Sequence, residues 1–282
     1  MKWHTQSLSL VTDDGMLHGE FLLPKAEGPF AGAVLCHGLG SDHRTMRPCA
    51  QRLTRHGIAT LTFDFRGHGR SGGTLDGNVE GDVLAAMDFL RHHPKVDAKR
   101  LALVGHSMGA MAVIRAASQL RGLRALVSLS SPSEMGGRAE RFLSSLYHEA
   151  AQIGSFIFEH PRHGPIPGLG KIAGMASVLW MRLRGYRLRI NWKKSIEFWG
   201  GQGLYPAVEK LGAFPKLFVH CKGDRLSPYE GAVELYRRAG APKELFLSEG
   251  GFHTSPLLPG KLRKRWIDWL VSALKDGEQR GK

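Results

Sequence analysis

Three side chains in this chain have the types and the order that nucleophilic attack on a carbonyl carbon requires. Ser107 lies in Gly-His-Ser-Met-Gly, Asp224 ends the run Cys-Lys-Gly-Asp, and His253 ends Gly-Gly-Phe-His. A serine hydroxyl is a weak nucleophile at neutral pH, so it needs a base to accept its proton and an acid to hold that base in one tautomer. The order serine, acid, histidine is one in which such triads occur. We therefore predict that Ser107 is the nucleophile, His253 the base and Asp224 the acid that orients it.

A tight turn from strand to helix is expected around the serine. The apolar run 101–104 indicates a strand, and 110–117 has helix-forming residues. In a G-x-S-x-G pattern the serine between two such elements adopts a strained backbone conformation that exposes its hydroxyl. Gly105 and Gly109 lack Cβ atoms, so they allow the close passage of the chain that this turn needs. The free N–H groups of the helix start favour negative charge near Ser107.

Attack on a carbonyl creates an oxyanion, which needs backbone donors directed at it. The Met108 N–H, directly after the nucleophile, is the first predicted donor. The second is expected from the loop His-Gly-Leu-Gly, where we predict the Leu39 N–H, with Gly38 as the alternative. His37 in that loop and His106 beside the serine are expected to brace and pack, and not to act as bases.

Each acidic and basic residue also has a structural interpretation. Asp224 follows a strand and is also suited to a turn or a cap, and His253 is also suited to a solvent-exposed loop. Asp64 and Asp97 precede the serine at loop positions typical of local capping, and Asp82 belongs to a helical segment. The chain order therefore favours Asp224 as the acid.

Strands and helices alternate along most of the chain. The segments 7–11 and 17–22, joined by Asp-Asp-Gly, predict an opening antiparallel hairpin. Further strands are expected at 31–36, 58–63, 101–104, 125–129, 216–221 and 244–247, with helices at 47–56, 80–92, 110–117, 229–238 and about 259–274. This alternation predicts an α/β fold, a mostly parallel central sheet with helices on both faces.

The alternation stops between residues 133 and 214, where Gly, Pro, aromatic and basic residues follow each other irregularly. A structureless loop of that length is unusual in a compact domain. We therefore predict a discontinuous core domain made of 1–132 and 215–282, with 133–214 inserted as a cap.

Composition indicates a globular protein with a large core. Of its 282 residues, 42% are hydrophobic, no apolar run is long enough to span a membrane, and the first residues lack the apolar region of a signal peptide. Cys36, Cys49 and Cys221 are odd in number, and two of them lie in apolar runs, which suggests buried thiols in a reducing compartment. A cytoplasmic protein is expected.

The formal net charge of +14 favours acidic ligands, nucleic acid or anionic membranes near the surface. No zinc-finger, RNA-recognition or helix-turn-helix pattern accompanies it, so nucleic-acid binding is not expected as the main function. No spacing typical of metal ligands is present, and no metal site is predicted.

Several motifs together resemble the α/β-hydrolase superfamily: the HGLG loop, DFRGHGRSGG from Asp64 to Gly73, GHSMG, Asp224 and His253. The phrase HPKVDAKRLALVGHSMGA resembles bacterial esterases of the cinnamoyl (feruloyl) type and, more loosely, monoacylglycerol lipases and serine aminopeptidase-like hydrolases. The resemblance implies an α/β-hydrolase fold, a Ser107–His253–Asp224 triad, no cofactor, and a cap that shapes the acyl or alcohol pocket. Superfamily members that displace halide or open epoxides have aspartate at the nucleophile position, and dienelactone hydrolases have cysteine. Serine here argues against both.

The leading hypothesis for function is hydrolysis of a carboxylic ester through an acyl-enzyme. A peptidase, an amidase or a thioesterase on the same scaffold is the alternative, and a non-catalytic binding protein would leave the triad unexplained. Between Glu159 and Glu197 the chain has no carboxylate to anchor the free amino end of a peptide, which favours esters. The natural ester, its chain length and the oligomeric state stay open.

The predicted cap contains a basic, alternating segment, WMRLRGYRLRI at 180–190. A hairpin with a Gly-Tyr turn would place four arginines on one face and apolar residues on the other; a helix over 172–183 is an equally favoured alternative. The basic face suits open solvent, an anionic or lipid-like ester, or peripheral contact with an anionic membrane. The four arginines are Arg182, Arg184, Arg187 and Arg189, and the candidate substrate-contacting residues are Trp180 and Leu183.

Overall fold

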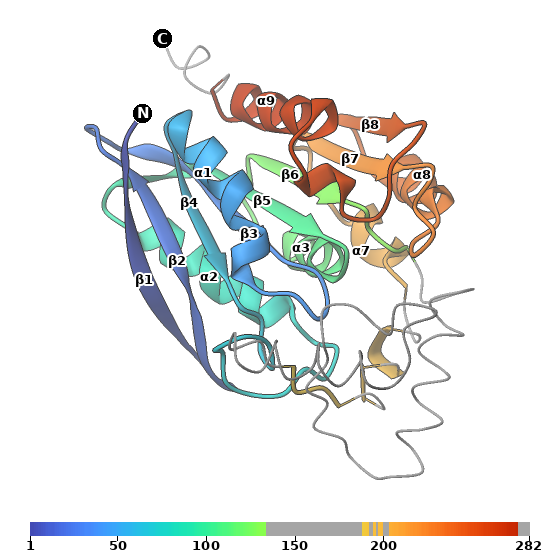
Figure 1. Cartoon of the computed structure of the whole chain (residues 1–282), viewed down its shortest axis with the longest axis horizontal. Coiled ribbons are helices and arrows are strands. Elements are labelled where there is room, and N and C mark those ends of the chain that lie inside the picture. Colours follow the sequence, from blue (N-terminus) through green and yellow to red (C-terminus); the bar gives the residue numbers. More distant parts are fainter. Residues whose placement is uncertain (134–187, 192–193, 196, 200–202, 276–282) are drawn as a thin grey trace, which may run out of the picture.

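The computed structural model describes residues 1–133, 188–191, 194–195, 197–199 and 203–275 of the chain. Within these residues a single sheet of eight strands forms the centre of the molecule, in the order β1-β2-β4-β3-β5-β6-β7-β8 (Figure 1). The strands are β1 (Trp3–Thr12), β2 (Gly15–Pro24), β3 (Phe30–Cys36), β4 (Ile58–Phe63), β5 (Val96–His106), β6 (Ala125–Leu129), β7 (Lys216–Cys221) and β8 (Lys243–Ser248).

The first two strands form the expected antiparallel hairpin. Thr12 lies opposite Gly15 in the register of β1 and β2, and Gly15 has a φ of +123°, which suits glycine at a tight turn. β2 also runs antiparallel to β4, whereas all remaining neighbours from β4 to β8 are parallel. The hairpin therefore extends one edge of a parallel sheet.

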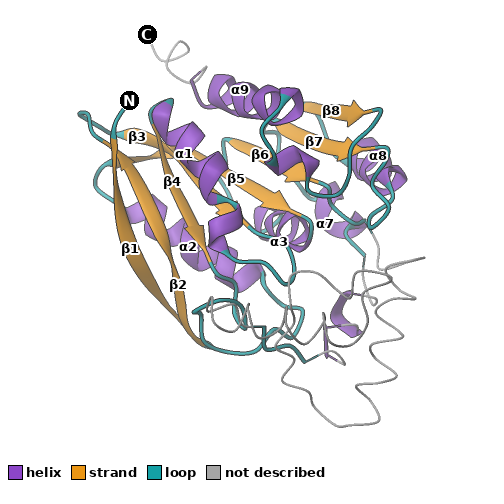
Figure 2. Cartoon of the chain, in the orientation of Figure 1, coloured by secondary structure: helices purple, strands orange, loops and turns teal. Residues whose placement is uncertain are grey.

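Helices cover both faces of the sheet (Figure 2). On one face α1 (Arg47–Arg55) and α9 (Lys261–Lys275) share an apolar layer that includes Leu53 and Trp266. On the other face α2 (Glu80–His92), α3 (Met108–Ala117), α7 (Tyr205–Glu209) and α8 (Tyr229–Arg238) share a second layer that includes Met87 and Leu235. Two short 3₁₀ helices, η1 (His43–Thr45) and η2 (Ser255–Leu257), lie in the connections.

The continuous apolar run of β3 follows from this double coverage. Val34 and Cys36 belong to one apolar layer, and Ala33 and Leu35 belong to the other. Successive side chains of a strand point to opposite faces, so a strand buried on both faces needs apolar residues at every position. Burying a leucine side chain such as that of Leu35 contributes about 1.5–3 kcal/mol.

The predicted fold class is confirmed, and the differences are at element ends. β5 begins at Val96 and not at 101, because Val96 pairs with Phe30 across a register shift. α9 begins at Lys261, two residues after the predicted position.

The predicted cap lies mostly outside the described residues. At its end, α7 (Tyr205–Glu209) lies against α3 and α8, and Val208 is buried in the same apolar layer as those helices. The division into core and cap remains a prediction.

The parallel strands direct their carboxyl ends to one edge of the sheet. The loop after β3 carries His-Gly-Leu-Gly, β5 ends at His106 beside the serine, β7 ends three residues before Asp224, and the loop after β8 carries His253. In open α/β sheets this edge is where ligands bind.

Candidate active site

Ser107 lies at the sharp turn between β5 and α3 that the sequence predicts. Its φ of +55° and ψ of −120° are unusual for a residue with a Cβ atom, and its N–H donates to the Leu129 carbonyl at 2.9 Å. A Cβ at Gly105 would lie 2.2 Å from the Gly109 carbonyl oxygen, and a Cβ at Gly109 would lie 2.5 Å from the Cys36 carbonyl oxygen. Only glycine fits at both positions, so the two glycines allow the turn that presents the serine.

Asp224 follows β7 and is buried, and both oxygens of its carboxylate accept hydrogen bonds. Oδ1 accepts the N–H groups of Leu226 at 2.9 Å and Ser227 at 3.0 Å, and Oδ2 accepts from His253 Nδ1 at 2.7 Å. Burial by itself would raise the pKa of Asp224, but hydrogen bonds from His220 and His253 outweigh it and lower that pKa. Asp224 is therefore an ionised acceptor at neutral pH.

The geometry of His253 fixes which of its nitrogens is free. Nδ1 faces a carboxylate oxygen, which only accepts, so Nδ1 carries the proton. Nε2 is buried and has no hydrogen-bond partner. In the neutral ring Nε2 is then an acceptor without a donor, which is the state of a general base before proton transfer.

The structure does not join Ser107 and His253 by a hydrogen bond. It places them close together through His106, whose ring centroid lies 4.9 Å from that of His253 and which directly precedes the serine. Catalytic hydrogen bonds are often long without substrate and tighten in the complex.

His106 holds the loop that carries His253. Its Nε2 donates to the His253 carbonyl at 3.0 Å. Burial, reinforced by the proximity of His253, lowers the pKa of His106 to about 3, so the ring stays neutral at physiological pH. The sequence predicts packing for His106, and the structure adds this hydrogen bond to the loop of the proposed base.

The loop after β3 approaches the serine closely. A Cβ at Gly38 would lie 3.1 Å from Ser107 Cβ and 3.2 Å from His106 Nδ1. The Gly40 N–H donates to His68 Nε2 at 3.2 Å and is already in use. Met108 opens α3, so its N–H is among those with no acceptor inside the helix. Met108 and Leu39 remain the predicted oxyanion donors.

Two neutral histidines brace this loop, as predicted for His37. His37 Nδ1 donates to the Gly38 carbonyl at 2.8 Å, and its Nε2 accepts the Phe65 N–H at 3.1 Å. His68 Nδ1 donates to the Arg66 carbonyl at 3.1 Å, while its Nε2 accepts from the loop. Burial, reinforced by the proximity of His37, lowers the pKa of His68 to about 3.

A buried ionic group fixes the segment 64–73 beneath the loop. Asp64 accepts the His43 N–H at 2.8 Å, His43 Nδ1 at 2.7 Å and the Arg70 N–H at 2.9 Å. Burial would raise the pKa of Asp64, but the hydrogen bond and charge of His43 lower it to about 2. Burial would lower the pKa of His43, but Asp64 and Glu20 raise it to about 9. Asp64 therefore accepts backbone N–H groups, as expected of a capping residue, and also forms an ion pair with His43.

The other two acidic residues that the sequence assigns to structural roles also have structural partners, although Asp97 lies in β5 and not in the expected loop, and the partner of Asp82 is distant in sequence. Asp97 accepts from the Lys99 N–H at 2.9 Å and from Arg100 Nε at 2.7 Å. Asp82 is fully buried in the first turn of α2 and forms an ion pair with Arg66 at 2.8 Å.

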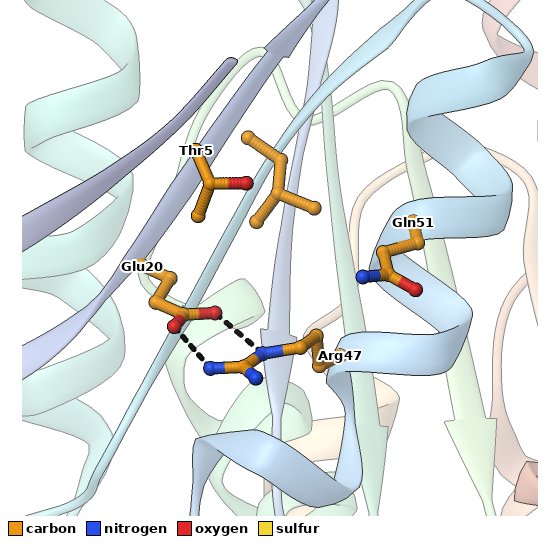
Figure 3. Close-up of a pocket in the computed structure, with 5 residues that line it drawn as sticks. Thr5, Glu20, Arg47 and Gln51 are labelled. Carbon is orange, nitrogen blue, oxygen red and sulfur yellow. Dashed lines mark hydrogen bonds and ion pairs between the residues drawn. The ribbon is translucent and has the colours of Figure 1, made fainter. Parts of the chain in front are cut away.

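A small cavity near the ionic group is distinct from the candidate site. It has a volume of about 160 Å³ and is lined by Thr5, Glu20, Leu22, Arg47 and Gln51. Figure 3 shows Arg47 of α1 pointing toward Glu20 of β2, with which it is ion-paired. The lining comes from β1, β2 and α1 and includes none of the predicted catalytic residues.

Only the end of the predicted basic segment is described. Leu188 and Ile190 are buried and bridge to His68 and Leu75, and Arg189 donates to the Ser71 carbonyl at 2.8 Å. Arg189 is thus partly held by the core. The other three arginines, Trp180 and Leu183 lie outside the described residues.

Sequence reasoning missed His220, a histidine within the apolar run of β7. Its ring is fully buried, and Nε2 lies 3.2 Å from Asp224 Oδ2. The available signal was a titratable residue inside a core strand, four positions before the predicted acid.

Cysteines and possible metal ligands add no further chemistry among the described residues. Cys36, Cys49 and Cys221 are free and buried, as expected for the two that lie in apolar runs. No group of three or more His, Cys, Asp or Glu side chains in the described ranges is arranged to hold a metal ion. None of the described helices has the length and apolar character needed to cross a membrane.

Comparison with known proteins matches most of the chain. The model of the alpha/beta hydrolase family matches residues 33–259. The uncharacterized protein YfhR of Escherichia coli K12 is 23% identical over 282 residues, covering 96% of this chain and 82% of YfhR.

Two solved structures share the fold. The esterase Pf2001 of Pyrococcus furiosus superimposes with a TM-score of 0.68 at 20% identity, covering 97% of this chain and 91% of the esterase. Est1E from Butyrivibrio proteoclasticus, solved with ferulic acid bound, has a TM-score of 0.64 at 18% identity, covering 97% and 98% of the two chains.

Proposed function

This chain belongs to the alpha/beta hydrolase family, which supports hydrolase activity, and from that premise we propose that it is a serine hydrolase of carboxylic esters. In this proposal Ser107 is the nucleophile, His253 the general base and Asp224 the acid that orients it. One observation carries the proposal. The buried Nε2 of His253 has no partner, while Nδ1 on the other side of the ring donates to a buried carboxylate.

The proposed reaction proceeds in two halves. Ser107 Oγ attacks the ester carbonyl carbon while its proton passes to His253 Nε2, and the Met108 and Leu39 N–H groups stabilise the oxyanion. The alcohol leaves with the proton from Nε2, and the acyl group stays on Ser107. Water then attacks the acyl carbon, gives a proton to the same Nε2, and the acid is released as that proton returns to Ser107.

Two features favour esters as the substrate class. The segment between Glu159 and Glu197 has no carboxylate to bind a peptide amino terminus. Two structural neighbours are an esterase and a protein solved with ferulic acid bound. We further propose that 133–214 forms a cap over the edge of the core formed by 1–132 and 215–282. Its basic residues would favour small anionic or lipid-like esters.

A substrate panel with variants tests this proposal. Purified protein is assayed with p-nitrophenyl esters of increasing acyl length, a feruloyl ester, an acyl thioester and aminoacyl anilides, and is labelled with a fluorophosphonate probe. We expect ester turnover and labelling in the parent, and a loss on the order of a thousandfold or more in Ser107→Ala, because triad members act as a unit.

The control is Ser118→Ala, the same change at the other end of α3, where the hydroxyl donates only to the Arg115 carbonyl. It should turn over and label like the parent. Faster hydrolysis of anilides or thioesters than of oxygen esters would assign the chain to those alternatives. Retained turnover by Ser107→Ala would remove the serine from the mechanism.

A further inference from the structure

A second histidine reaches the carboxylate that orients His253. His220 lies in β7, four residues before Asp224, and its side chain is fully buried. Its Nε2 lies 2.9 Å from the Ser227 carbonyl oxygen and 3.2 Å from Asp224 Oδ2. The chain between β7 and α8 therefore folds back over this ring.

The neighbours of Nε2 determine where the proton of His220 lies. A carbonyl oxygen and an ionised carboxylate oxygen only accept hydrogen bonds, so Nε2 must carry hydrogen in either charge state of the ring. Nδ1 of the same ring is buried and has no partner. The hydrogen bonding of His220 is thus directed entirely at Ser227 and Asp224.

The two oxygens of the Asp224 carboxylate have different partners. Oδ1 accepts two backbone N–H groups of its own loop. Oδ2 accepts from His253 Nδ1 at 2.7 Å and lies 3.2 Å from His220 Nε2, whose N–H donates to the Ser227 carbonyl. Two histidines, one from β7 and one from the loop after β8, therefore share one oxygen.

We propose that His220 is a positioning residue that acts through Asp224, fixing the carboxylate and limiting how strongly Oδ2 stabilises the protonated form of His253. The inference rests on the proposed function, because it uses the same Asp224–His253 pair. An N–H-bearing nitrogen 3.2 Å from a carboxylate oxygen offsets part of the negative charge on that oxygen. Removing His220 leaves more negative charge on Oδ2, which favours protonated His253. The active neutral base then forms only at higher pH.

The other titratable groups around the pair do not compete for this role. His106, on the β5 side, is held neutral because burial lowers its pKa to about 3. Cys221, next to His220 in β7, is a neutral thiol because burial raises its pKa. On the solvent side, Lys222 and Glu249 form an exposed ion pair with each other at 2.8 Å.

The test replaces His220 by residues that differ in donor position. In His220→Gln the amide nitrogen can replace Nε2–H, whereas in His220→Asn the shorter side chain does not reach Oδ2, and in His220→Leu the donor is absent. The pH profile of kcat/KM for a p-nitrophenyl ester is measured for each variant. We expect the acidic limb to move up by roughly half to one pH unit in the Leu and Asn variants. We also expect a kcat lower by about threefold to tenfold with a nearly unchanged KM. The Gln variant should follow the parent.

Val219→Ala is the matched control, since it removes packing from the adjacent position of the same strand, whose side chain points to the opposite face. A merely structural role would lower the melting temperature in the control and in the His220 variants alike and leave the acidic limb in place.

A second readout needs no turnover. The low-field proton resonance of His253 Nδ1–H, recorded in Ser107→Ala with and without the His220 changes, should move further downfield when the donor is lost. This resonance can be measured even if the protein hydrolyses none of the esters in the panel, so the two proposals are tested separately. An acidic limb and a resonance that match the parent in folded His220→Asn or His220→Leu would overturn the inference.

Discussion

Two groups of histidines flank the serine, and they differ in whether they must change charge. On the loop side, His37 and His68 hold the backbone of the His-Gly-Leu-Gly loop as neutral rings. On the base side, the proposed mechanism requires His253 to gain and lose a proton in each half-reaction. The partners of a histidine beside a nucleophile therefore indicate its role. His37 and His68 bond to backbone groups and brace the loop. His253 bonds through Nδ1 to the buried Asp224 carboxylate and leaves Nε2 without a partner, as a candidate base requires.

The two sides also differ in how their carboxylates are compensated. Asp64 on the loop side pairs with His43, whose pKa is raised to about 9, so that pair is ionic at neutral pH. Asp224 on the base side is compensated by backbone N–H groups and by two imidazole rings. Asp224 thus stays ionised without a permanent cation that would repel protonated His253.

The largest expected effect comes from breaking the base side at Asp224→Asn. An amide NH₂ at the Oδ2 position faces N–H groups of both histidines, and it favours the His253 tautomer whose Nε2 carries a proton and does not accept one. We expect kcat for a neutral ester to fall by about 10³–10⁴. Steady-state assays would measure the loss of kcat, and circular dichroism would show that the variant is folded.

Asp97→Asn is the control for this change, since Asp97 accepts hydrogen bonds from Lys99 and Arg100 of its own strand, β5. It should leave kcat unchanged. A near-parental kcat in Asp224→Asn would mean that Asp224 does not orient His253 as the base.

A smaller effect is expected from displacing the loop side with Gly38→Ala. The added methyl group would lie 3.1 Å from Ser107 Cβ, so the loop must shift by a few tenths of an ångström and misplace an oxyanion donor. We expect kcat to fall by about tenfold to a hundredfold, with little change in KM. Steady-state kinetics on the same ester measure the split.

The matched control is Gly240→Ala, where an added Cβ has no atom within 4 Å. Parental kinetics in Gly38→Ala would show that this loop does not set the position of an oxyanion donor.

The smallest expected effect is on thermal stability, and it concerns the ion pair between Asp64 and His43 on the loop side. The folded pKa of His43 is about 9, above its unfolded value of about 6.5. The stability that protonated His43 contributes is therefore fully present below about pH 6.5 and is lost as the pH rises through about 9. For Asp64 the pKa is lowered from 3.8 to about 2, so its contribution is present above 3.8 and is lost as the pH falls through about 2.

Thermal unfolding across this range tests the assignment. We expect the parent Tm to fall by roughly 5 °C between about pH 6.5 and 9 through His43. His43→Gln should lower the Tm at pH 6.5 and remove most of that decline. His92→Gln, at an exposed pair with Asp88, should keep the parental slope. Equal slopes in the parent and in His43→Gln would exclude His43 as the titrating group.

Patterns local in the sequence determined much of the fold. Apolar runs bounded by Gly, Pro and charged residues predicted most strands, and the predicted helix 80–92 matches α2 (Glu80–His92). The predicted strand 101–104 is too short because the charged residues Asp97, Lys99 and Arg100 interrupt the apolar pattern, although the backbone pairing of β5 begins at Val96. Hydrogen bonding between backbones does not depend on side-chain polarity, so composition alone did not reveal that extension.

The sequence by itself also determined which residue types stand at the candidate site and in which order, because a glycine-flanked serine after an apolar strand leaves few other interpretations. Only the tertiary structure decided which of the fourteen histidines contacts which carboxylate. His253 and Asp224 are 29 residues apart in sequence, and His106 and His253 are 147 apart. Such contacts depend on the order of strands in the sheet. The same holds for charge: burial and partners from distant segments give His43 and His68 opposite pKa shifts.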